Sequence, residues 1–379
     1  MNILHVIAGL NQGGAEAALY RLVSSSPPII QHTIISLMND GAYGSRLQEC
    51  GAKVHTLDMR NSWISLWGLF RLYQIIRRTK PDVVQTWMYH ANLIGGLIAR
   101  LAGVRAIVFG IHHADTDFSK FKWTSILVVY INKFISYFIP VGIVYVSENN
   151  RESHRKFGLC SATDKIIYNG VDLNQFRPGE TERVRTRVEW DIKPDEILIG
   201  LVARWDVYKD HRNLLEALSL LASKSIPIRC VLVGTEMDAG NLTLTDLIAT
   251  YGLEMNIILA GSRPDIPAVM NAIDLHVLSS SGEAFGNVTV EAMACGTPCV
   301  STDVGAASMI IGNAGWVVPP RDAVRLSQGI EAGMAALNSC DRNSIKINCR
   351  QRVSESFGVE KMVESYLTLW AMAINKTKG

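Results

Sequence analysis

Residues 274–298 read DLHVLSSSGEAFGNVTVEAMACGTP, a stretch in which a strand, a loop and a helix follow one another. Asp274–Leu278 is short and largely apolar, which is typical of a buried strand. A helix begins at Asn287 or Val288, and a second apolar strand, Pro298–Ser301, follows it. Two buried strands joined by a helix indicate neighbouring parallel strands, the repeating unit of an α/β fold.

The same alternation extends along the whole chain. Further buried strands are expected at Ile3–Ala8, Thr33–Leu37, Val83–Thr86, Ala106–Gly110, Ile143–Ser147, Ile197–Leu201, Ile228–Gly234 and Ile257–Leu259. Segments of helical length and spacing lie between strands, at Ala15–Ser24, Ser62–Thr79, Ala91–Ala102 and Asn213–Lys224. The pattern restarts near residues 170–180, so we expect two doubly wound α/β domains. Ligands of such domains bind at the carboxyl ends of the strands, here in the cleft between the domains.

Size and composition agree with two globular domains. The chain has 379 residues, of which 48% are hydrophobic and 19% charged, which excludes a disordered or fibrous protein. The net charge of +2 gives no indication of nucleic-acid binding. Residues 1–175 hold 17 Lys and Arg against 11 Asp and Glu, whereas the remainder holds 20 against 24. An anionic surface is therefore expected beside the first domain only.

The cysteines and the N-terminus predict a cytoplasmic protein. The seven cysteines, at positions 50, 160, 230, 295, 299, 340 and 349, are scattered and include no CxxC pair. They are typical of buried thiols in a reducing compartment. The first residues, MNILHVI, lack the charged and long apolar regions of a signal peptide and predict a strand.

Two stretches of the first half combine aromatic rings with cations. Residues 60–80 place four aromatic side chains at helical spacing among arginines, and residues 118–140 carry three lysines around two apolar runs. Neither is an uninterrupted apolar run of about 20 residues, as a membrane span requires. Each alone could be an ordinary core-facing helix. Together with the basic half, they favour contact with the inner face of the plasma membrane.

Two glutamates and two cations suggest chemistry on a sugar diphosphate. Glu283 and Glu291 lie eight residues apart around the start of a helix, where free N–H groups and the helix dipole favour an anion. A carboxylate beside a phosphate would repel it unless the carboxylate binds hydroxyl groups, which points to a sugar or ribose. Arg204 and Lys209 follow the strand Ile197–Leu201 and could neutralise charge on a departing diphosphate oxygen. Taken singly, each would be an ordinary helix, loop or surface residue.

Glycines and histidines follow two strands of the first half. Gly13 and Gly14 come after the first strand, where they let the backbone approach a ligand, but the GxGxxG spacing of a dinucleotide site is missing. His112 and His113 could bind substrate hydroxyl groups or assist proton transfer; a hydrogen-bonded structural role is an equal alternative. The nearby Asp115-x-Asp117 pair is too common a pattern to predict a metal site.

Four motifs together resemble the retaining glycosyltransferases of family 4, which have the GT-B fold. They are Glu283-x7-Glu291, Arg204 with Lys209, Gly13-Gly14-Ala15-Glu16 and Asn169-Gly170-Val171-Asp172. The resemblance covers nearly the whole chain. It implies an acceptor-binding domain over residues 1–175, a nucleotide-sugar-binding domain over 176–357, and a C-terminal helix over 358–379 that packs back on the first domain.

The resemblance also implies roles in a metal-independent sugar transfer. Arg204 and Lys209 would bind the donor diphosphate, Glu291 the ribose hydroxyls, and Glu283 the transferred sugar. The other donor-binding residues would be Gly13, Gly14, Phe285, Gly286, Asn287, Val288, and Arg263 in the base-binding loop. Either His112 or His113 would be the catalytic histidine, alongside Glu283, Arg204 and Lys209. The stretch Trp87-Met-Tyr-His-Ala-Asn, which contains His90, resembles the sequences of members that build bacterial surface polysaccharides. His90 would therefore bind the acceptor together with His112 and His113.

We therefore expect a retaining hexosyl- or N-acetylhexosaminyltransferase that uses a nucleotide sugar, with UDP favoured over GDP. The expected acceptor is a lipid-linked saccharide in O-antigen, lipopolysaccharide or capsule assembly, at the inner membrane face. Three alternatives stay open: a soluble-acceptor transferase of the sucrose or glycogen type, an epimerase of the same fold, and a non-catalytic nucleotide-sugar-binding subunit. Gly305-Ala-Ala-Ser-Met stands where many members have Gly-Gly-x-x-Glu.

Overall fold

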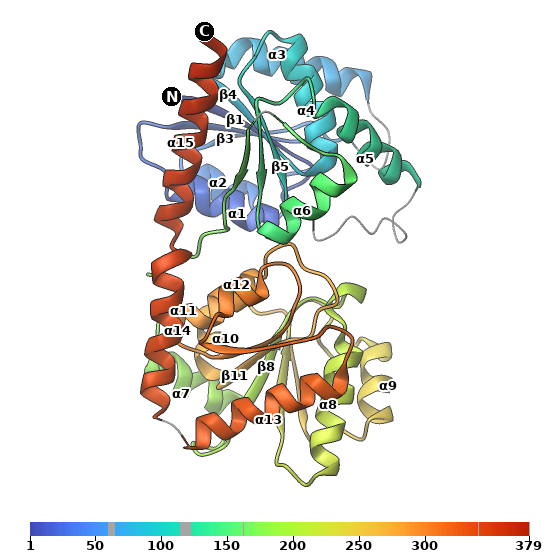
Figure 1. Ribbon diagram of the computed structural model, residues 1–379, viewed down its shortest axis with the longest axis vertical. Helices are drawn as coiled ribbons and strands as arrows, with labels where there is room; N and C mark the ends of the chain where they lie inside the picture. The colour runs from blue at the N-terminus through green and yellow to red at the C-terminus, as the bar shows by residue number, and fades with distance from the viewer. Residues whose placement is uncertain (60–64, 114–122, 162, 340, 379) are drawn as a thin grey trace. The chain divides into compact units, whose positions relative to one another are not determined.

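The computed structural model describes residues 1–59, 65–113, 123–161, 163–339 and 341–378 (Figure 1). The chain divides into two compact units. Unit 1 comprises Met1–Gly170 together with Val359–Gly379, and unit 2 comprises Val171–Gly358. Each unit has its own parallel sheet with helices on both faces.

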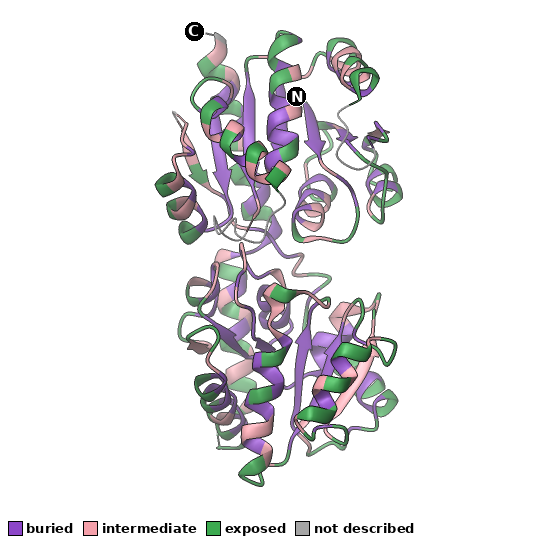
Figure 2. Ribbon diagram, turned by 90° about the vertical axis from the view of Figure 1, so that its right-hand side faces the viewer, coloured by how far each residue is buried: buried purple, intermediate pink, exposed green. Residues whose placement is uncertain are grey.

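Unit 1 is built on a seven-stranded sheet in the order β3-β2-β1-β4-β5-β6-β7. The strands are β1 (Asn2–Ile7), β2 (Gln31–Ser36), β3 (Lys53–Thr56), β4 (Val83–Trp87), β5 (Ile107–Ile111), β6 (Gly142–Tyr145) and β7 (Asp164–Ile166). The inner strands are buried along nearly their whole length, because helices cover both faces of the sheet (Figure 2). The strand order reverses between β1 and β4, and ligands of open α/β sheets bind at such a reversal.

The helices of unit 1 are α1 (Gly14–Ser24), α2 (Gly44–Glu49), α3 (Leu66–Thr79), α4 (Met88–Leu101), α5 (Trp123–Ile135), α6 (Glu148–Phe157) and the C-terminal α15 (Val359–Lys378). Local sequence specifies several of their ends. The Ser65 and Ser147 hydroxyls accept backbone N–H groups at the starts of α3 and α6. Gly158 ends α6 in the left-handed conformation, with φ +102°.

Helix α15 completes one face of the unit 1 sheet, beside α1 (Figure 1). Trp370 is fully buried there, and its Nε1 donates a hydrogen bond to Gln85 Oε1 of β4 at 3.3 Å. Tyr366 stacks on Trp87, with ring centroids 5.9 Å apart. Helix α15 therefore packs in the same hydrophobic core as β1.

Unit 2 contains a six-stranded sheet in the order β10-β9-β8-β11-β12-β13. Its strands are β8 (Leu198–Val202), β9 (Arg229–Val233), β10 (Ile257–Gly261), β11 (Leu275–Leu278), β12 (Cys299–Thr302) and β13 (Gly315–Val318). Its helices are α7 (Glu180–Glu189), the 3-10 turn η2 (Val207–Lys209), α8 (His211–Ser223), α9 (Leu242–Thr250), α10 (Ile266–Ala272), α11 (Asn287–Ala294), α12 (Ala307–Ile311), α13 (Ala323–Ser339) and α14 (Arg342–Ser356). The strand order reverses here between β8 and β11, so the preferred ligand position again lies at their carboxyl ends.

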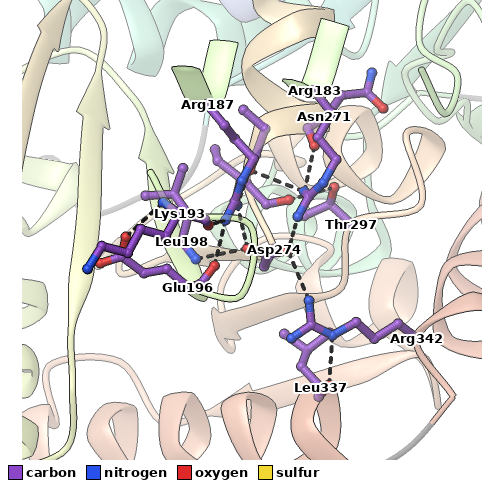
Figure 3. A network of polar contacts seen from close by, with 12 residues as sticks. Arg183, Arg187, Lys193, Glu196, Leu198, Asn271, Asp274, Thr297, Leu337 and Arg342 are labelled. Atoms are coloured by element: carbon purple, nitrogen blue, oxygen red, sulfur yellow. Dashed lines mark hydrogen bonds and ion pairs between the residues drawn. The ribbon is translucent and has the colours of Figure 1, made fainter. Parts of the chain in front are cut away.

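A buried ion-pair network lies at the amino end of β11 (Figure 3). Asp274 accepts hydrogen bonds from Arg183 at 2.6 Å and from Arg187 at 2.7 Å. The Leu198 N–H donates to the same carboxylate at 2.9 Å, which connects β8 to the network. Arg187 also donates to the Ala272 carbonyl, so its charge is well satisfied despite burial. The network therefore fixes α7 to the sheet at the edge away from the carboxyl ends of the strands.

The fold class predicted from the sequence is confirmed. Every predicted strand is present, with ends shifted by at most two residues. Three strands were missed, and all three lie at sheet edges: β3, β7 and β13. They are short and partly exposed, and β3 and β7 lack the apolar run that marks the buried strands. No helix in the described part of the chain is both long and apolar enough to cross a membrane.

Candidate active site

The carboxyl ends of β8 and β11 bring Lys209 and Glu283 together. Lys209 ends the turn η2 after β8, and Glu283 lies in the loop after β11. Lys209 Nζ is 2.5 Å from Glu283 Oε1, and Ser280 Oγ donates to the same oxygen at 2.7 Å. The two side chains of the ion pair are 21% and 13% exposed. A ligand at this edge of the sheet could therefore reach both.

Hydrogen bonds fix the two loops to each other. The Ser281 N–H donates to the Tyr208 carbonyl at 2.7 Å, and Ser279 Oγ donates to the Lys209 carbonyl at 2.9 Å. The next residue, Asp210, has a left-handed backbone with φ +49° and caps α8. Backbone of this kind persists when the surrounding structure holds it, and it is common at functional sites.

Arg204 follows β8 and is oriented by Asp206. Its Nε and Nη2 donate to Asp206 Oδ2 at 3.1 and 2.8 Å, while Asp206 Oδ1 accepts the Tyr208 N–H. Burial raises the pKa of Asp206, but the bonds from Tyr208 and Arg204 outweigh it and leave this pKa below its usual value. The Arg204 side chain is 59% exposed. It is therefore an oriented cation that can still bind an anion.

The loop after Glu283 turns directly into α11. Gly286 lies at the start of the helix with φ +104°, a conformation that L side chains rarely adopt. The dipole of a helix places partial positive charge at its first turn, so this end of α11 suits an anion. Phe285 anchors the turn by packing against Phe357, with ring centroids 5.9 Å apart. Glu291 lies one turn further along the helix and is 7% exposed.

The loop after β12 supports Glu283 through its backbone. Gly305 has φ +59°, and a Cβ there would lie 2.6 Å from the Glu283 carbonyl oxygen. The Ala306 N–H donates to the Phe285 carbonyl at 3.3 Å. The segment that departs from the family pattern therefore contacts the Glu283 loop without using a side chain.

The positive charge of Lys209 contributes to lowering the pKa of two buried histidines. Burial, with a smaller effect of Lys209, lowers the pKa of His211 to about 4 and that of His276 to about 3. His211 packs against Trp205, with ring centroids 4.8 Å apart. Both histidines are therefore neutral near pH 7, and Lys209 and Arg204 supply the positive charge at this edge.

Arg263 lies in the loop after β10 and is held by two carboxylates. Its Nε donates to Asp265 at 2.9 Å, and its Nη1 bonds to Glu189 at the end of α7. These bonds hold the pKa of Arg263 above its usual value. In this structure Arg263 connects α7 to the β10–α10 loop, and its contact with a base stays a prediction.

In unit 1, Gly13 and Gly14 lie between β1 and α1. A Cβ at Gly13 would lie 2.3 Å from a carboxylate oxygen of Glu16, so this carboxylate folds over the start of the helix. The glycine turn lies at the carboxyl end of β1, beside the reversal in strand order. Its contact with a donor stays a prediction.

His112 follows β5 and stacks on Trp87 at the end of β4, with ring centroids 4.8 Å apart. Trp87 Nε1 donates to His5 Nδ1 at 3.2 Å, and His5 Nε2 lies 3.0 Å from His32 Nδ1. Both ring nitrogens of His112 are buried and bond to none of the described residues. Burial, with a smaller effect of His113, lowers the pKa of His112 to about 3. His112 is therefore a neutral imidazole near pH 7, and its contact with a substrate stays a prediction.

His113 is part of a closed set of contacts. Its ring stacks on Tyr89, with centroids 4.9 Å apart, and Tyr89 Oη bonds to His154 Nε2. His154 Nδ1 bonds to the Asn150 carbonyl at 2.7 Å, and Asn150 Nδ2 donates to the His113 carbonyl at 2.5 Å. These contacts fix the backbone of the histidine pair. His90 lies in the first turn of α4 and is exposed.

Two further features of the described residues concern possible metal ligands and a cavity. Among the described residues, no group of three or more His, Cys, Asp and Glu side chains is placed to hold a metal ion. Asp115 and Asp117 lie outside the described residues. A cavity of about 350 Å³ adjoins Arg183, Asp274 and Arg342, at the amino end of β11 (Figure 3). It is therefore separate from the Lys209–Glu283 pair.

Two family models match nearly the whole chain. The model described as Glycosyltransferase Family 4 matches residues 12–175, and the model described as Glycosyl transferases group 1 matches residues 182–347. The chain therefore belongs to the family 4, group 1 glycosyltransferases. It is a GT-B-fold glycosyltransferase that uses a nucleotide sugar, which confirms the predicted family, fold and enzyme class.

The chain is similar to named bacterial glycosyltransferases. The chain is 25% identical over 318 residues to the Escherichia coli UDP-Gal:alpha-D-GlcNAc-diphosphoundecaprenol alpha-1,3-galactosyltransferase, covering 82% of this chain and 80% of that protein. It is 21% identical to the Staphylococcus aureus capsular polysaccharide biosynthesis glycosyltransferase CapM, covering 86% of each. Among solved structures, Anabaena HepE in complex with UDP-glucose matches with a TM-score of 0.84 at 21% identity, covering 98% of this chain and all of that one. This last likeness concerns the fold.

The structure brings some of the predicted residues close together within each unit. In unit 2, Arg204, Lys209, Glu283 and the start of α11 lie at one edge of the sheet. In unit 1, His112 and His113 lie at the corresponding edge. Sequence analysis missed Asp206 and Ser280, which orient Arg204 and Glu283. Their closeness to the predicted residues, two and three positions away, was the available signal.

Proposed function

We propose that this glycosyltransferase moves a sugar from a UDP-sugar to a lipid-linked saccharide during bacterial surface-polysaccharide assembly, with retention of the anomeric configuration. The observation that carries the proposal is the Lys209–Glu283 ion pair beside the start of α11. It combines a cation for a diphosphate with a carboxylate for sugar hydroxyl groups.

The donor diphosphate binds between Arg204, Lys209 and the first turn of α11. Lys209 then exchanges part of its contact with Glu283 for a phosphate oxygen, and Glu283 accepts hydrogen bonds from hydroxyl groups of the transferred sugar. Glu291 binds the ribose hydroxyls. Its low exposure suits this role, because a partly buried carboxylate binds neutral hydroxyl donors without competition from bulk water.

The new bond forms on the same face of the sugar from which the diphosphate leaves, so the anomeric configuration is retained. The acceptor hydroxyl oxygen bonds to the anomeric carbon as the bond from this carbon to the diphosphate oxygen breaks, and the hydroxyl proton passes to the departing phosphate. Arg204 and Lys209 stabilise the negative charge that develops on this phosphate. In unit 1, the ring nitrogens of His112, which bond to none of the described residues, position substrate hydroxyl groups.

The lipid-linked acceptor is supported by the Escherichia coli relative, whose name specifies a diphosphoundecaprenol substrate. An acceptor of this kind stays in a membrane, so the enzyme must reach the membrane surface. The exposed aromatic side chains of α3 and α5, together with the exposed Arg77 and Arg78 of α3, suit that location.

Thermal shift with UDP, GDP and their sugars tests the donor site. A ligand that binds only the folded protein raises its melting temperature. We expect UDP compounds to stabilise the wild type and to have a much weaker effect on Glu291→Gln. The matched control is Glu254→Ala, at an exposed residue of the same unit. Equal shifts in Glu291→Gln and the control would contradict the role of Glu291.

Incubation with labelled UDP-sugars and a diphospholipid-linked sugar tests the reaction. We expect label in the lipid fraction. NMR should show that the new glycosidic linkage has the same anomeric configuration as the sugar in the donor. Transfer only to free sugars would indicate a soluble-acceptor enzyme, and conversion of the donor sugar without acceptor would indicate an epimerase. Donor binding without turnover on any acceptor would indicate a binding subunit.

A further inference from the structure

The exposed aromatic side chains of this protein are concentrated on one part of unit 1. Among the described residues, every exposed Trp, Phe and Tyr lies on α3, on α5 or in the turn after α5: Trp67, Phe70, Trp123, Tyr130, Phe134, Tyr137 and Phe138. Helix α4 packs between α3 and α5 and adds the exposed Leu97 and Leu101. Exposed apolar side chains scattered singly are normal, but a concentration of this kind marks an interaction surface.

The same three helices carry only positive charge. Helices α3, α4 and α5 contain no Asp or Glu and five cations: Arg71, Arg77, Arg78, Arg100 and Lys133. A surface of aromatic rings and cations without carboxylates complements an anionic lipid headgroup layer. Self-association through this face would place equal cations opposite each other in a two-fold dimer, which is unfavourable.

A groove on this surface brings the two kinds of side chain together. It lies between β3 and α3, has a volume of about 330 Å³, and is lined by Trp67, Phe70, Arg71, Arg78, Gln74, Ile75 and His55. None of the described carboxylates forms an ion pair with Arg71 or Arg78. Arg71 lies 5.3 Å from the centre of the Trp67 ring, so the ring and the cation line the same wall. The groove is therefore lined by two cations and two exposed aromatic rings.

We propose that this groove binds the phosphate headgroup of an anionic phospholipid, with Arg71 and Arg78 on the phosphate and Trp67 and Phe70 inserted at headgroup depth. The inference deepens the membrane contact of the proposed function and rests on it. It specifies a lipid site separate from the donor and acceptor residues, because α3 follows the edge strand β3, whereas His112 follows β5 in the interior of the sheet. The lipid would hold the enzyme at the surface where its acceptor resides.

Vesicle flotation tests the site on the full chain. We expect strong binding to phosphatidylcholine vesicles that contain phosphatidylglycerol, and weak binding to phosphatidylcholine alone. Arg71→Gln with Arg78→Gln should weaken binding to the anionic vesicles roughly 30-fold, since each cation near such a surface contributes about fivefold. Trp67→Ala with Phe70→Ala should weaken binding to both kinds of vesicle.

The matched control removes two charges at the opposite edge of the same sheet. Lys165 lies on β7, and Lys376 bonds to Thr163 beside it, whereas the groove adjoins β3. Lys165→Gln with Lys376→Gln should stay within about twofold of wild type, because charges beyond a Debye length are screened. Equal loss in the two double variants would overturn the proposal.

Two further measurements separate the remaining outcomes. Saturable binding of glycerol phosphate without preference for anionic vesicles would assign the groove to a soluble phosphate compound and overturn the lipid site. Light scattering measures the oligomeric state. A wild-type dimer that becomes a monomer in the variant Trp67→Ala with Phe70→Ala would assign the surface to self-association and would also overturn the lipid site. UDP thermal shifts in all variants report the donor site independently, so failure of the lipid site is distinguishable from failure of the proposed transfer.

Discussion

Lys209 Nζ lies 2.5 Å from Glu283 Oε1, although 74 positions separate the two residues in the chain. The contact exists because β8 and β11 are neighbours in the sheet and their following loops meet at one edge. Each partner has one further constraint: Lys209 ends a 3-10 turn, and Glu283 accepts a bond from Ser280. The ion pair therefore holds a cation and a carboxylate together at this edge of the sheet, where we propose that the donor binds.

Lys209→Met should lower the rate of sugar transfer by roughly 10²- to 10³-fold, as expected when a group that stabilises transition-state charge is removed. Lys224→Met is the matched control, because Lys224 forms an exposed ion pair with Glu331 in the same unit at 2.7 Å. Steady-state kinetics on both variants measures the difference. Equal rates for Lys209→Met and Lys224→Met would show that Lys209 does not act on the leaving group.

Gly305→Ala should reduce transfer more than its backbone strain alone explains. The new Cβ would lie 2.6 Å from the Glu283 carbonyl oxygen and so displace the Glu283 loop. Gly252→Ala supplies the control, because Gly252 has φ +66° and no atom within 4 Å of the added Cβ. In both variants an alanine must adopt the left-handed backbone conformation, and this strain should lower the free energy of unfolding by about 1–2 kcal/mol. If their transfer rates also match, Gly305 has no special relationship to Glu283.

Asp274→Asn should destabilise unit 2 by about 3–5 kcal/mol, because it leaves the buried Arg183 and Arg187 without their carboxylate. Urea unfolding followed by Trp fluorescence measures the change. Asp246→Asn, at an exposed residue on α9, should change the unfolding free energy by less than about 0.5 kcal/mol. A small effect at Asp274 would show that the backbone carbonyl groups around the two arginines satisfy them without the ion pair.

The protein should lose stability as the pH falls below about 6.5. Burial lowers the pKa of His32, His154 and His211 to about 4 and that of His276 to about 3, and it lowers the pKa of His5 well below its usual value. The unfolded chain therefore takes up protons near pH 6.5 that the folded chain takes up only near pH 4.

Each such histidine should reduce the free energy of unfolding by about 1.4 kcal/mol per pH unit between these values. Urea midpoints measured from about pH 7.5 to 5.5 should be flat above pH 6.5 and fall below it. His276→Leu should give a shallower fall, because His276 is fully buried and its ring nitrogens bond to no described residue. A wild-type midpoint that stays constant to pH 5.5 would show that these histidines are not held neutral.

The buried strands could be predicted from the sequence alone, whereas the roles of the site residues stay predictions. The inner strands are apolar because both of their faces are covered, and this produces the runs from which they were predicted. Edge strands such as β3 and β7 lack this requirement, so their sequences, KVHT and DKI, do not identify them. The glutamates, the Arg204-Lys209 pair and the glycine turn were predicted as site residues because each contains the residue types that the expected chemistry needs.

The tertiary structure decided which of these residues contact one another and what surrounds each histidine ring. The sequence contains Lys209, Glu283 and Gly305, but only the neighbouring loops after β8, β11 and β12 bring them together. It contains His112 and His113 side by side, yet the stacking on Trp87 and Tyr89 gives each ring a different environment. Local sequence specifies the conformation of a helix or a turn, because the hydrogen bonds and caps of such a segment join residues a few positions apart. Contacts between segments far apart in the chain depend on strand order, which forms only when the whole unit folds.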